Sequence, residues 1–190
     1  MSDANSRYVL ENVNVLVLDD NRHMRQLVES ILHALGVKQV CQAGDAAQAF
    51  KELQHFNADV IIVDWHMEPL DGLDFVRLVR TAKDSPNPYV PIIMLSGYTE
   101  YHRVIEARDA GVHEFLAKPI SAKALYQRFA AIIDNPRPFI RTKAYFGPDR
   151  RRQNVGPPRG VQERRDGEKA ESTSAGLSEE DVKSLMDSEE

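Results

Sequence analysis

The segment Val13-Asn14-Val15-Leu16-Val17-Leu18-Asp19-Asp20 decides the fold class of this 190-residue chain. Its apolar run is typical of a buried β-strand, and two carboxylates end it abruptly. From Asn21 to Leu35, apolar residues recur at helical spacing, and Gly36 stops the predicted helix. A buried strand followed at once by an amphipathic helix is the repeating unit of an α/β fold.

The same alternation of strand and helix continues along the chain. Further strands are predicted over residues 37–43, 59–64, 91–96 and 114–117, and further helices over residues 45–56, 73–83, 100–110 and 122–133. Five strand–helix units without an interruption favour a doubly wound, mainly parallel sheet, written (βα)5.

The alternation ends after Asp134, because the run Asn135-Pro136-Arg137-Pro138 cannot continue a helix. We therefore expect one folded domain over residues 10–135, an Arg-, Pro- and Gly-rich extension over 136–176, and an acidic short helix or disordered tail over 177–190. The extension contains too few apolar residues to fold alone, so a largely irregular tail is predicted. The residues that could anchor it to the domain are Phe139, Ile140, Tyr145 and Phe146.

The net charge of −5 hides opposite charges in two neighbouring parts of the tail. Residues 137–169 contain ten Lys/Arg and four Asp/Glu, whereas residues 170–190 contain seven Asp/Glu and one lysine. The single cysteine, Cys41, excludes a disulfide framework. The chain begins without the apolar region of a signal peptide, and no apolar run reaches the ~18 residues of a membrane-spanning helix. The expectation is a soluble cytoplasmic protein without membrane insertion.

Polar residues stand where the predicted strands end. Asp19 and Asp20 follow the first strand, Asp64 ends the third, Ser96 ends the fourth, and Lys118-Pro119 follows the fifth. The carboxyl ends of parallel strands share one edge of the sheet, so these side chains are expected to converge there. Proline directly after Lys118 favours a cis peptide bond, which would help to turn the lysine side chain into the site.

These residue types suit phosphoryl chemistry on a carboxylate. Oxygen ligands without a Cys or His cluster favour Mg²⁺ over Zn²⁺. A carboxylate oxygen of Asp64 could attack phosphorus, while Lys118 and Ser96 contact the transferred phosphoryl oxygens.

The joint pattern resembles the receiver domain of two-component response regulators, specifically the small CheY-like kind, over roughly residues 10–135. The resemblance implies a flavodoxin-like fold, phosphorylation by a sensor histidine kinase or phosphotransfer protein, and no enzymatic activity beyond self-phosphotransfer and autodephosphorylation. In the loop that follows Asp64, proline stands one place later than in the family pattern, with Glu68 in its expected position. The roles implied by the resemblance are the phosphoacceptor Asp64, the switch residues Ser96 and Phe115, the phosphoryl-binding Lys118, and a Mg²⁺ shell of Asp19, Asp20, Asp64 and the backbone carbonyl of His66.

Arginine carries nearly all of the positive charge of the extension, and its guanidinium group binds phosphates bidentately and stacks on flat bases. The stretch resembles the arginine-rich tails of CheY-like effectors of cyclic di-GMP, which act at the flagellar motor. The residues predicted to bind this dinucleotide are Asp149, Arg150, Arg151, Arg152, Arg159, Arg164, Arg165 and Asp166. No helix suited to reading a DNA groove is evident, so DNA is not an expected partner.

The final segment, from Leu177 to Met186, is similar to the N-terminal peptide of the flagellar switch protein FliM. It could dock on the receiver's own partner groove, or it could be a solvated acidic helix.

Two other functions remain open at the level of sequence. The first is a stand-alone receiver that acts as a phosphate shuttle or sink and has an inert tail; nucleotide binding by residues 141–166 would separate it from the cyclic di-GMP effector. The second is a phosphohydrolase with an aspartyl-phosphate intermediate. Phosphohydrolases of the haloacid-dehalogenase type have an Asp-x-Asp pair after the first strand, whereas Asp19 and Asp20 are adjacent.

Overall fold

The computed structural model describes residues 8–97, 100–142, 145–150 and 170–171. Its main sheet has five parallel strands in the order β2-β1-β3-β4-β5. These strands are β1 (Asn14–Leu18), β2 (Gln39–Ala43), β3 (Val60–Asp64), β4 (Ile92–Ser96) and β5 (Glu114–Ala117). The helices between and after them are α1 (Arg22–Ala34), α2 (Ala46–Glu52), α3 (Gly72–Thr81), α4 (Tyr101–Ala110) and α5 (Ala122–Asp134). The predicted doubly wound (βα)5 fold is confirmed.

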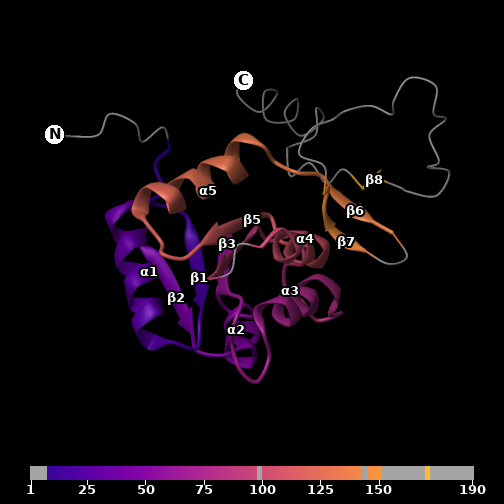
Figure 1. The fold of residues 1–190 in the computed structure, drawn as a ribbon, viewed down its shortest axis with the longest axis horizontal. Coiled ribbons are helices and arrows are strands. Elements are labelled where there is room, and N and C mark those ends of the chain that lie inside the picture. Colours follow the sequence, from indigo (N-terminus) through magenta and orange to yellow (C-terminus); the bar gives the residue numbers. More distant parts are fainter. Residues whose placement is uncertain (1–7, 98–99, 143–144, 151–169, 172–190) are drawn as a thin grey trace, which may run out of the picture.

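Helices cover both faces of the sheet (Figure 1), which is why its strands are apolar throughout. Along β1, Val15 and Val17 face α1 and α5, whereas Leu16 and Leu18 belong to the core beneath α2, α3 and α4. Burying a side chain of this size contributes about 1.5–3 kcal/mol. The two apolar layers thus fix the sheet and, with it, the edge at which the polar residues gather.

Short polar caps start the helices close to the strand ends. The side chain of Asn21 accepts hydrogen bonds from the backbone N–H groups of His23 and Met24, and Asp71 caps α3 in the same way. Gly36 follows α1 with a φ of 95°, in the left-handed region that favours glycine, so the predicted stop is confirmed.

Helix α2 is shorter than predicted. The sequence pattern extended to Phe56, but the helix ends at Glu52. Beyond it the backbone N–H groups of Gln54 and His55 bond to carbonyls only three residues back, in Lys51 and Glu52. The last turn is therefore tightened, which apolar periodicity does not reveal.

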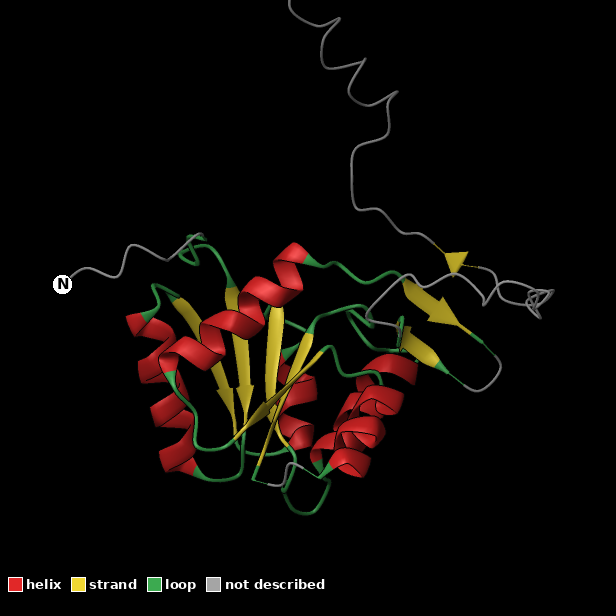
Figure 2. Cartoon of the chain, turned by 45° about the horizontal axis from the view of Figure 1, so that its top comes forward, coloured by secondary structure: helices red, strands yellow, loops and turns green. Residues whose placement is uncertain are grey.

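The extension begins with a β-hairpin that the sequence analysis did not predict. Strands β6 (Phe139–Arg141) and β7 (Phe146–Pro148) pair antiparallel, and β8 (Ala170–Glu171) pairs with the other edge of β6. The hairpin lies beside α3 and α4, on the side of the molecule away from α1 (Figures 1 and 2). Strands of three residues are too short for a period-2 pattern to be recognised, and Pro138 before β6 and Pro148 at the end of β7 disfavour a strand prediction further.

Aromatic rings attach this hairpin to the domain. Tyr89, in the loop before β4, makes edge contacts with Phe139 and Phe146 at centroid distances of 5.0 and 5.4 Å. The prediction that these phenylalanines could anchor the extension thus has a structural basis, although an irregular chain was expected around them.

None of the helices in the described ranges combines the length and the apolar character needed to span a lipid bilayer.

Candidate functional site

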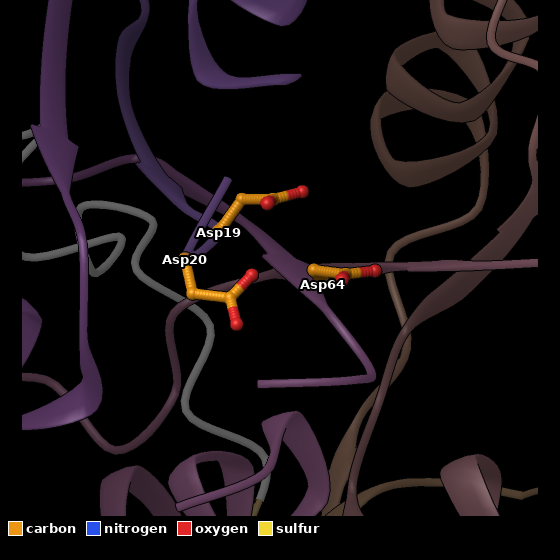
Figure 3. A group of neighbouring side chains, drawn as sticks. All are labelled: Asp19, Asp20 and Asp64. Atoms are coloured by element: carbon orange, nitrogen blue, oxygen red, sulfur yellow. The ribbon is translucent and has the colours of Figure 1, made fainter. Parts of the chain in front are cut away.

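The strand order reverses between β1 and β3, and in open α/β sheets ligands bind beyond the carboxyl ends of the strands at such a point. Asp19 and Asp20 directly follow β1, and Asp64 is the last residue of β3. Figure 3 shows the three side chains projecting from these neighbouring chain segments, and one carboxylate oxygen from each lies within 4.8 Å of those of the other two. Asp19 and Asp64 are buried, whereas Asp20 is exposed.

Lys118 is the cation of this site. Its Nζ lies 2.9 Å from Asp64 Oδ1 and donates a hydrogen bond of 3.3 Å to Asp19 Oδ2. Burial alone would lower the lysine pKa, but the hydrogen bond and charge of Asp64, joined by those of Asp19, raise it above its usual value. The bond between Lys118 and Pro119 is cis, as predicted. Lys118 is therefore firmly protonated between the two buried acids.

Within the cluster, the surroundings of Asp19 disfavour its charged form. Burial raises its pKa, and the charge of Asp64 adds to the effect, against the opposing backbone N–H of Asn21 and the charge of Lys118. Three carboxylates gather in this part of the structure and Lys118 pairs with two of them, Asp19 and Asp64, so a second cation would relieve their repulsion. A set of carboxylate oxygens suits a hard ion such as Mg²⁺.

Sequence reasoning missed one residue of the site, Arg25. Its guanidinium donates to the backbone carbonyls of Asp19 and Asp20, at 2.7 and 3.3 Å. It therefore positions the loop that carries both acids. An arginine on the first turn of the helix that follows an acidic pair is the signal that could have revealed it.

Ser96 and Phe115, the predicted switch residues, come from the neighbouring strands β4 and β5. Ser96 is the buried last residue of β4, and its backbone carbonyl accepts a hydrogen bond of 2.8 Å from the N–H of Lys118. Phe115 is half-buried and meets the ring of Trp65 edge-on, with centroids 6.3 Å apart. Because Trp65 directly follows Asp64, ring contacts lead from the acidic site to β5.

The loop after β3 holds His66, whose carbonyl was predicted as a metal ligand. Its side chain is exposed, and Glu68 precedes a cis bond to Pro69 at the place where the sequence departs from the family pattern. The loop closes where the N–H of Gly72 donates to the carbonyl of Trp65 over 2.9 Å.

Two of the residues predicted to bind cyclic di-GMP are described. Arg150 lies over the ring of Tyr145, with its guanidinium carbon 4.5 Å from the centroid, and its Nη1 is 3.3 Å from Asp109 Oδ1 on α4. The backbone N–H of Asp149 donates a hydrogen bond of 2.8 Å to the carbonyl of Pro138. The other predicted ligands, Arg151, Arg152, Arg159, Arg164, Arg165 and Asp166, lie outside the described residues, as does the segment 177–190.

The family model for the response regulator receiver domain matches residues 15–130, which is more than half of the chain. The chain belongs to this family. Its receiver is similar to the chemotaxis protein CheY of Pseudomonas aeruginosa, with 30% identity over 64% of this chain and 97% of the relative. It is also similar to chemotaxis protein CheY1 of Helicobacter pylori, with 34% identity over 64% of this chain and 97% of the relative.

Solved structures agree with this assignment. Vibrio cholerae CheY4 is 31% identical, with a TM-score of 0.58 over 63% of this chain and 98% of that structure. The receiver of the Arabidopsis thaliana histidine kinase CKI1, solved as a complex with Mg²⁺ and BeF3⁻, is 26% identical, with a TM-score of 0.56 over 64% of this chain and 92% of that one. A receiver of the CheY type is a signalling domain rather than a classical enzyme, and receivers interact with histidine kinases or phosphotransfer proteins.

The receiver's burial of Asp19 leads to a first prediction. Because its pKa is raised on folding, ionised Asp19 destabilises the fold at pH values above that raised pKa, and this cost fades as the pH falls toward 3.8. We expect Asp19→Asn to be at least as stable as the parent at pH 7 without Mg²⁺. Mg²⁺ at tenfold its dissociation constant should stabilise the parent by about 1.4 kcal/mol and leave the variant almost unchanged.

Thermal denaturation with and without Mg²⁺ measures both effects, and the fluorescence of Trp65, the single tryptophan, reports on metal binding directly. Asp84→Asn removes an exposed carboxylate elsewhere and serves as the control. A variant with Asn at position 19 that gains as much stability from Mg²⁺ as the parent would show that Asp19 holds no metal.

Proposed function

We propose that Asp64 accepts a phosphoryl group in a cytoplasmic two-component pathway. The observation that carries the proposal is the contact of 2.9 Å between Lys118 Nζ and Asp64 Oδ1, inside a cluster of three carboxylates. The aspartate oxygen attacks phosphorus and forms a new P–O bond. The bond to the donor, a phosphohistidine nitrogen or a small acyl phosphate, breaks and its electron pair leaves with the donor.

The residues around Asp64 have separate tasks in this step. Lys118 moves from pairing with the free carboxylate to pairing with a phosphoryl oxygen, and the hydroxyl of Ser96 donates to another. Asp19, Asp20, Asp64 and the His66 carbonyl hold Mg²⁺, which when bound offsets the negative charge on the phosphoryl oxygens. The Mg²⁺ and BeF3⁻ in the solved receiver of CKI1 support this assignment.

The output is proposed to be a change of the surface between α4 and β5. A groove of about 270 Å³ lies there, lined among others by Tyr101, Phe115 and Arg137. Phosphorylation draws Ser96 toward the phosphoryl group and lets Phe115 follow, which reshapes this groove. The chemotaxis proteins among the relatives support a chemotaxis-type role, with the flagellar switch protein FliM as a candidate partner.

Chemical trapping tests the phosphorylation directly. The full chain is incubated with Mg²⁺ and acetyl phosphate, the acyl phosphate is reduced with borohydride, and mass spectrometry locates the homoserine that replaces the modified aspartate. Homoserine at position 64 supports the proposal. Homoserine at another position, or none, contradicts it.

As a second function we propose that the arginine-rich extension binds cyclic di-GMP. The supporting observation is the placement of Arg150. Its guanidinium carbon lies 4.5 Å from the centroid of the Tyr145 ring, and its side chain is 45% exposed although Asp109 pairs with it. A guanidinium held beside an aromatic ring offers both stacking and phosphate binding. Without this binding, the chain would be a receiver with an inert tail that passes phosphoryl groups between kinases and phosphotransfer proteins.

For cyclic di-GMP we predict calorimetric binding by the full chain and a loss of at least roughly tenfold in affinity for the double variant Arg150→Ala/Arg151→Ala. Arg77→Ala, on the exposed side of α3, is the matched control and should bind like the parent. If the parent releases or absorbs no heat with cyclic di-GMP, or if the double variant binds it with equal affinity, the proposal that the arginine-rich extension binds cyclic di-GMP is wrong.

A further inference from the structure

Arg80, in the last turn of α3, is a buried charge that the phosphorylation site does not use. Its side chain is 3% exposed. The guanidinium donates to the backbone carbonyls of Pro88 at 2.7 Å, Val90 at 2.8 Å and Gly111 at 3.1 and 3.2 Å. No carboxylate pairs with it within the described ranges, so its charge is offset by carbonyl dipoles and by the ring of Phe139.

The groups that cover Arg80 add no negative charge. The ring of Phe139 in β6 lies 5.3 Å from the guanidinium carbon. His113 Nδ1 accepts a hydrogen bond from the N–H of Ile92, and its pKa is well below the usual value because of burial and the charges of Arg80 and Arg137. The histidine is therefore neutral. Burial lowers the pKa of Arg80 to about 9, which still leaves it charged at pH 7.

A cavity of about 580 Å³ opens beside this charge, between the loop after α3 and the hairpin. Among the residues that the structure describes, its charged lining residues are Arg80, Lys83 and Arg141, and none of its lining residues is acidic. Lys83 and Arg141 are exposed and form no ion pair within the part of the chain that the structure describes. Phe146 holds Arg141 at the wall, with the guanidinium carbon 4.4 Å from the ring centroid.

The cavity is separate from the acidic site. Helix α3 starts at Gly72 beside the end of β3 and reaches the cavity at its other end, Thr81. Ten residues of α-helix span about 15 Å. The cavity thus lies at the amino edge of the sheet, and the aspartates lie at the carboxyl edge.

We propose that this cavity binds a phosphate group, either as free inorganic phosphate or as part of a nucleotide. Three cationic side chains line the cavity and no acidic residue among the described ones does. The buried Arg80 has no charged partner there, which is costly, so a dianionic or phosphodiester group supplies the missing charge. The volume is within the range of sites for nucleotide-sized ligands. Phosphorylation of Asp64 is not required, and only the nucleotide form rests on the second function proposed above.

The test follows backbone amide resonances of the full ¹⁵N-labelled chain in Mg²⁺-free buffer. One arm titrates inorganic phosphate and the other cyclic di-GMP, both at constant ionic strength, with chloride as the reference anion. We expect saturable shifts at the amides of Lys83, Ser85 and Thr142. Lys83→Gln and Arg141→Gln each weaken this binding about tenfold, whereas the control Lys51→Gln does not.

The two arms separate the sources of the phosphate group. Saturable shifts at these amides with phosphate support the general proposal, and shifts with cyclic di-GMP support its nucleotide form. Shifts that chloride reproduces, or that survive both Gln variants, overturn it. Cyclic di-GMP that binds without shifting these amides leaves the second proposed function standing and overturns the nucleotide form.

Discussion

Asp64→Asn is expected to abolish phosphoryl incorporation from acetyl phosphate, with a loss of roughly 10³-fold or more in rate. The carboxamide has no anionic oxygen to attack phosphorus, and it removes one of the three carboxylates that gather the metal. It also takes away the charge that Lys118 Nζ contacts at 2.9 Å. The fold should survive, because an amide oxygen can still accept from the lysine. Phosphoprotein formed over time, with circular dichroism as the check on folding, measures the effect.

The matched control lies at the other end of the same strand. Asp59 directly precedes β3, and its Oδ2 accepts a hydrogen bond of 2.8 Å from the N–H of Asn14. Asp59→Asn makes the same chemical change at the opposite edge of the sheet, so its rate should equal that of the parent. If the Asp64 variant still incorporates phosphoryl groups at more than one-tenth of the parent rate, the phosphoacceptor is another residue.

Gly72→Ala is expected to have the largest effect on stability. A Cβ at position 72 would overlap the backbone carbonyl oxygen of Asp64 and lie 3.1 Å from the Cα of Trp65. Both obstacles are backbone atoms, so the start of α3 must move away from the end of β3. Forced overpacking of this kind costs about 1–3 kcal/mol and more where backbone must shift, which is a fall in melting temperature of roughly 10 °C.

The displacement would also disturb the phosphoacceptor, so Gly72→Ala should lose Mg²⁺ affinity along with stability. Gly97→Ala is the control, because a Cβ there meets no atom within 4 Å. Thermal denaturation of both variants, with and without Mg²⁺, checks the prediction. Equal melting temperatures for the two would show that the contact between α3 and β3 is not as tight as the structure has it.

The carboxyl edge of the sheet was predictable because two signals coincide along the chain. Apolar runs long enough to recognise end at Leu18, Val63 and Leu95, and parallel topology then brings the polar residues that follow them together. Asp19, Asp64 and Lys118 do meet there. Their roles in phosphorylation and metal binding remain predictions for the experiments above.

The amino edge could not be predicted in the same way. Arg80 looks like any arginine in the last turn of a helix, and its partners are backbone carbonyls 8 to 31 residues away, which carry no side-chain signature. The hairpin strands are three residues long. Attachment was indicated only by four large side chains, Phe139, Ile140, Tyr145 and Phe146, because such side chains in a polar segment require a surface to cover.

The pairing of Arg150 with Asp109 holds the last described residue of the hairpin segment beside α4. Arg150 also lines the groove between α4 and β5, so a ligand held by Arg150 lies next to α4. When two contacts belong to one chain, the second forms at an effective concentration set by the link between them, about millimolar for short links. A partner that touches both the tail and the groove therefore gains avidity over either contact alone, and the strength of the output then depends on tether length as much as on the chemistry of either surface.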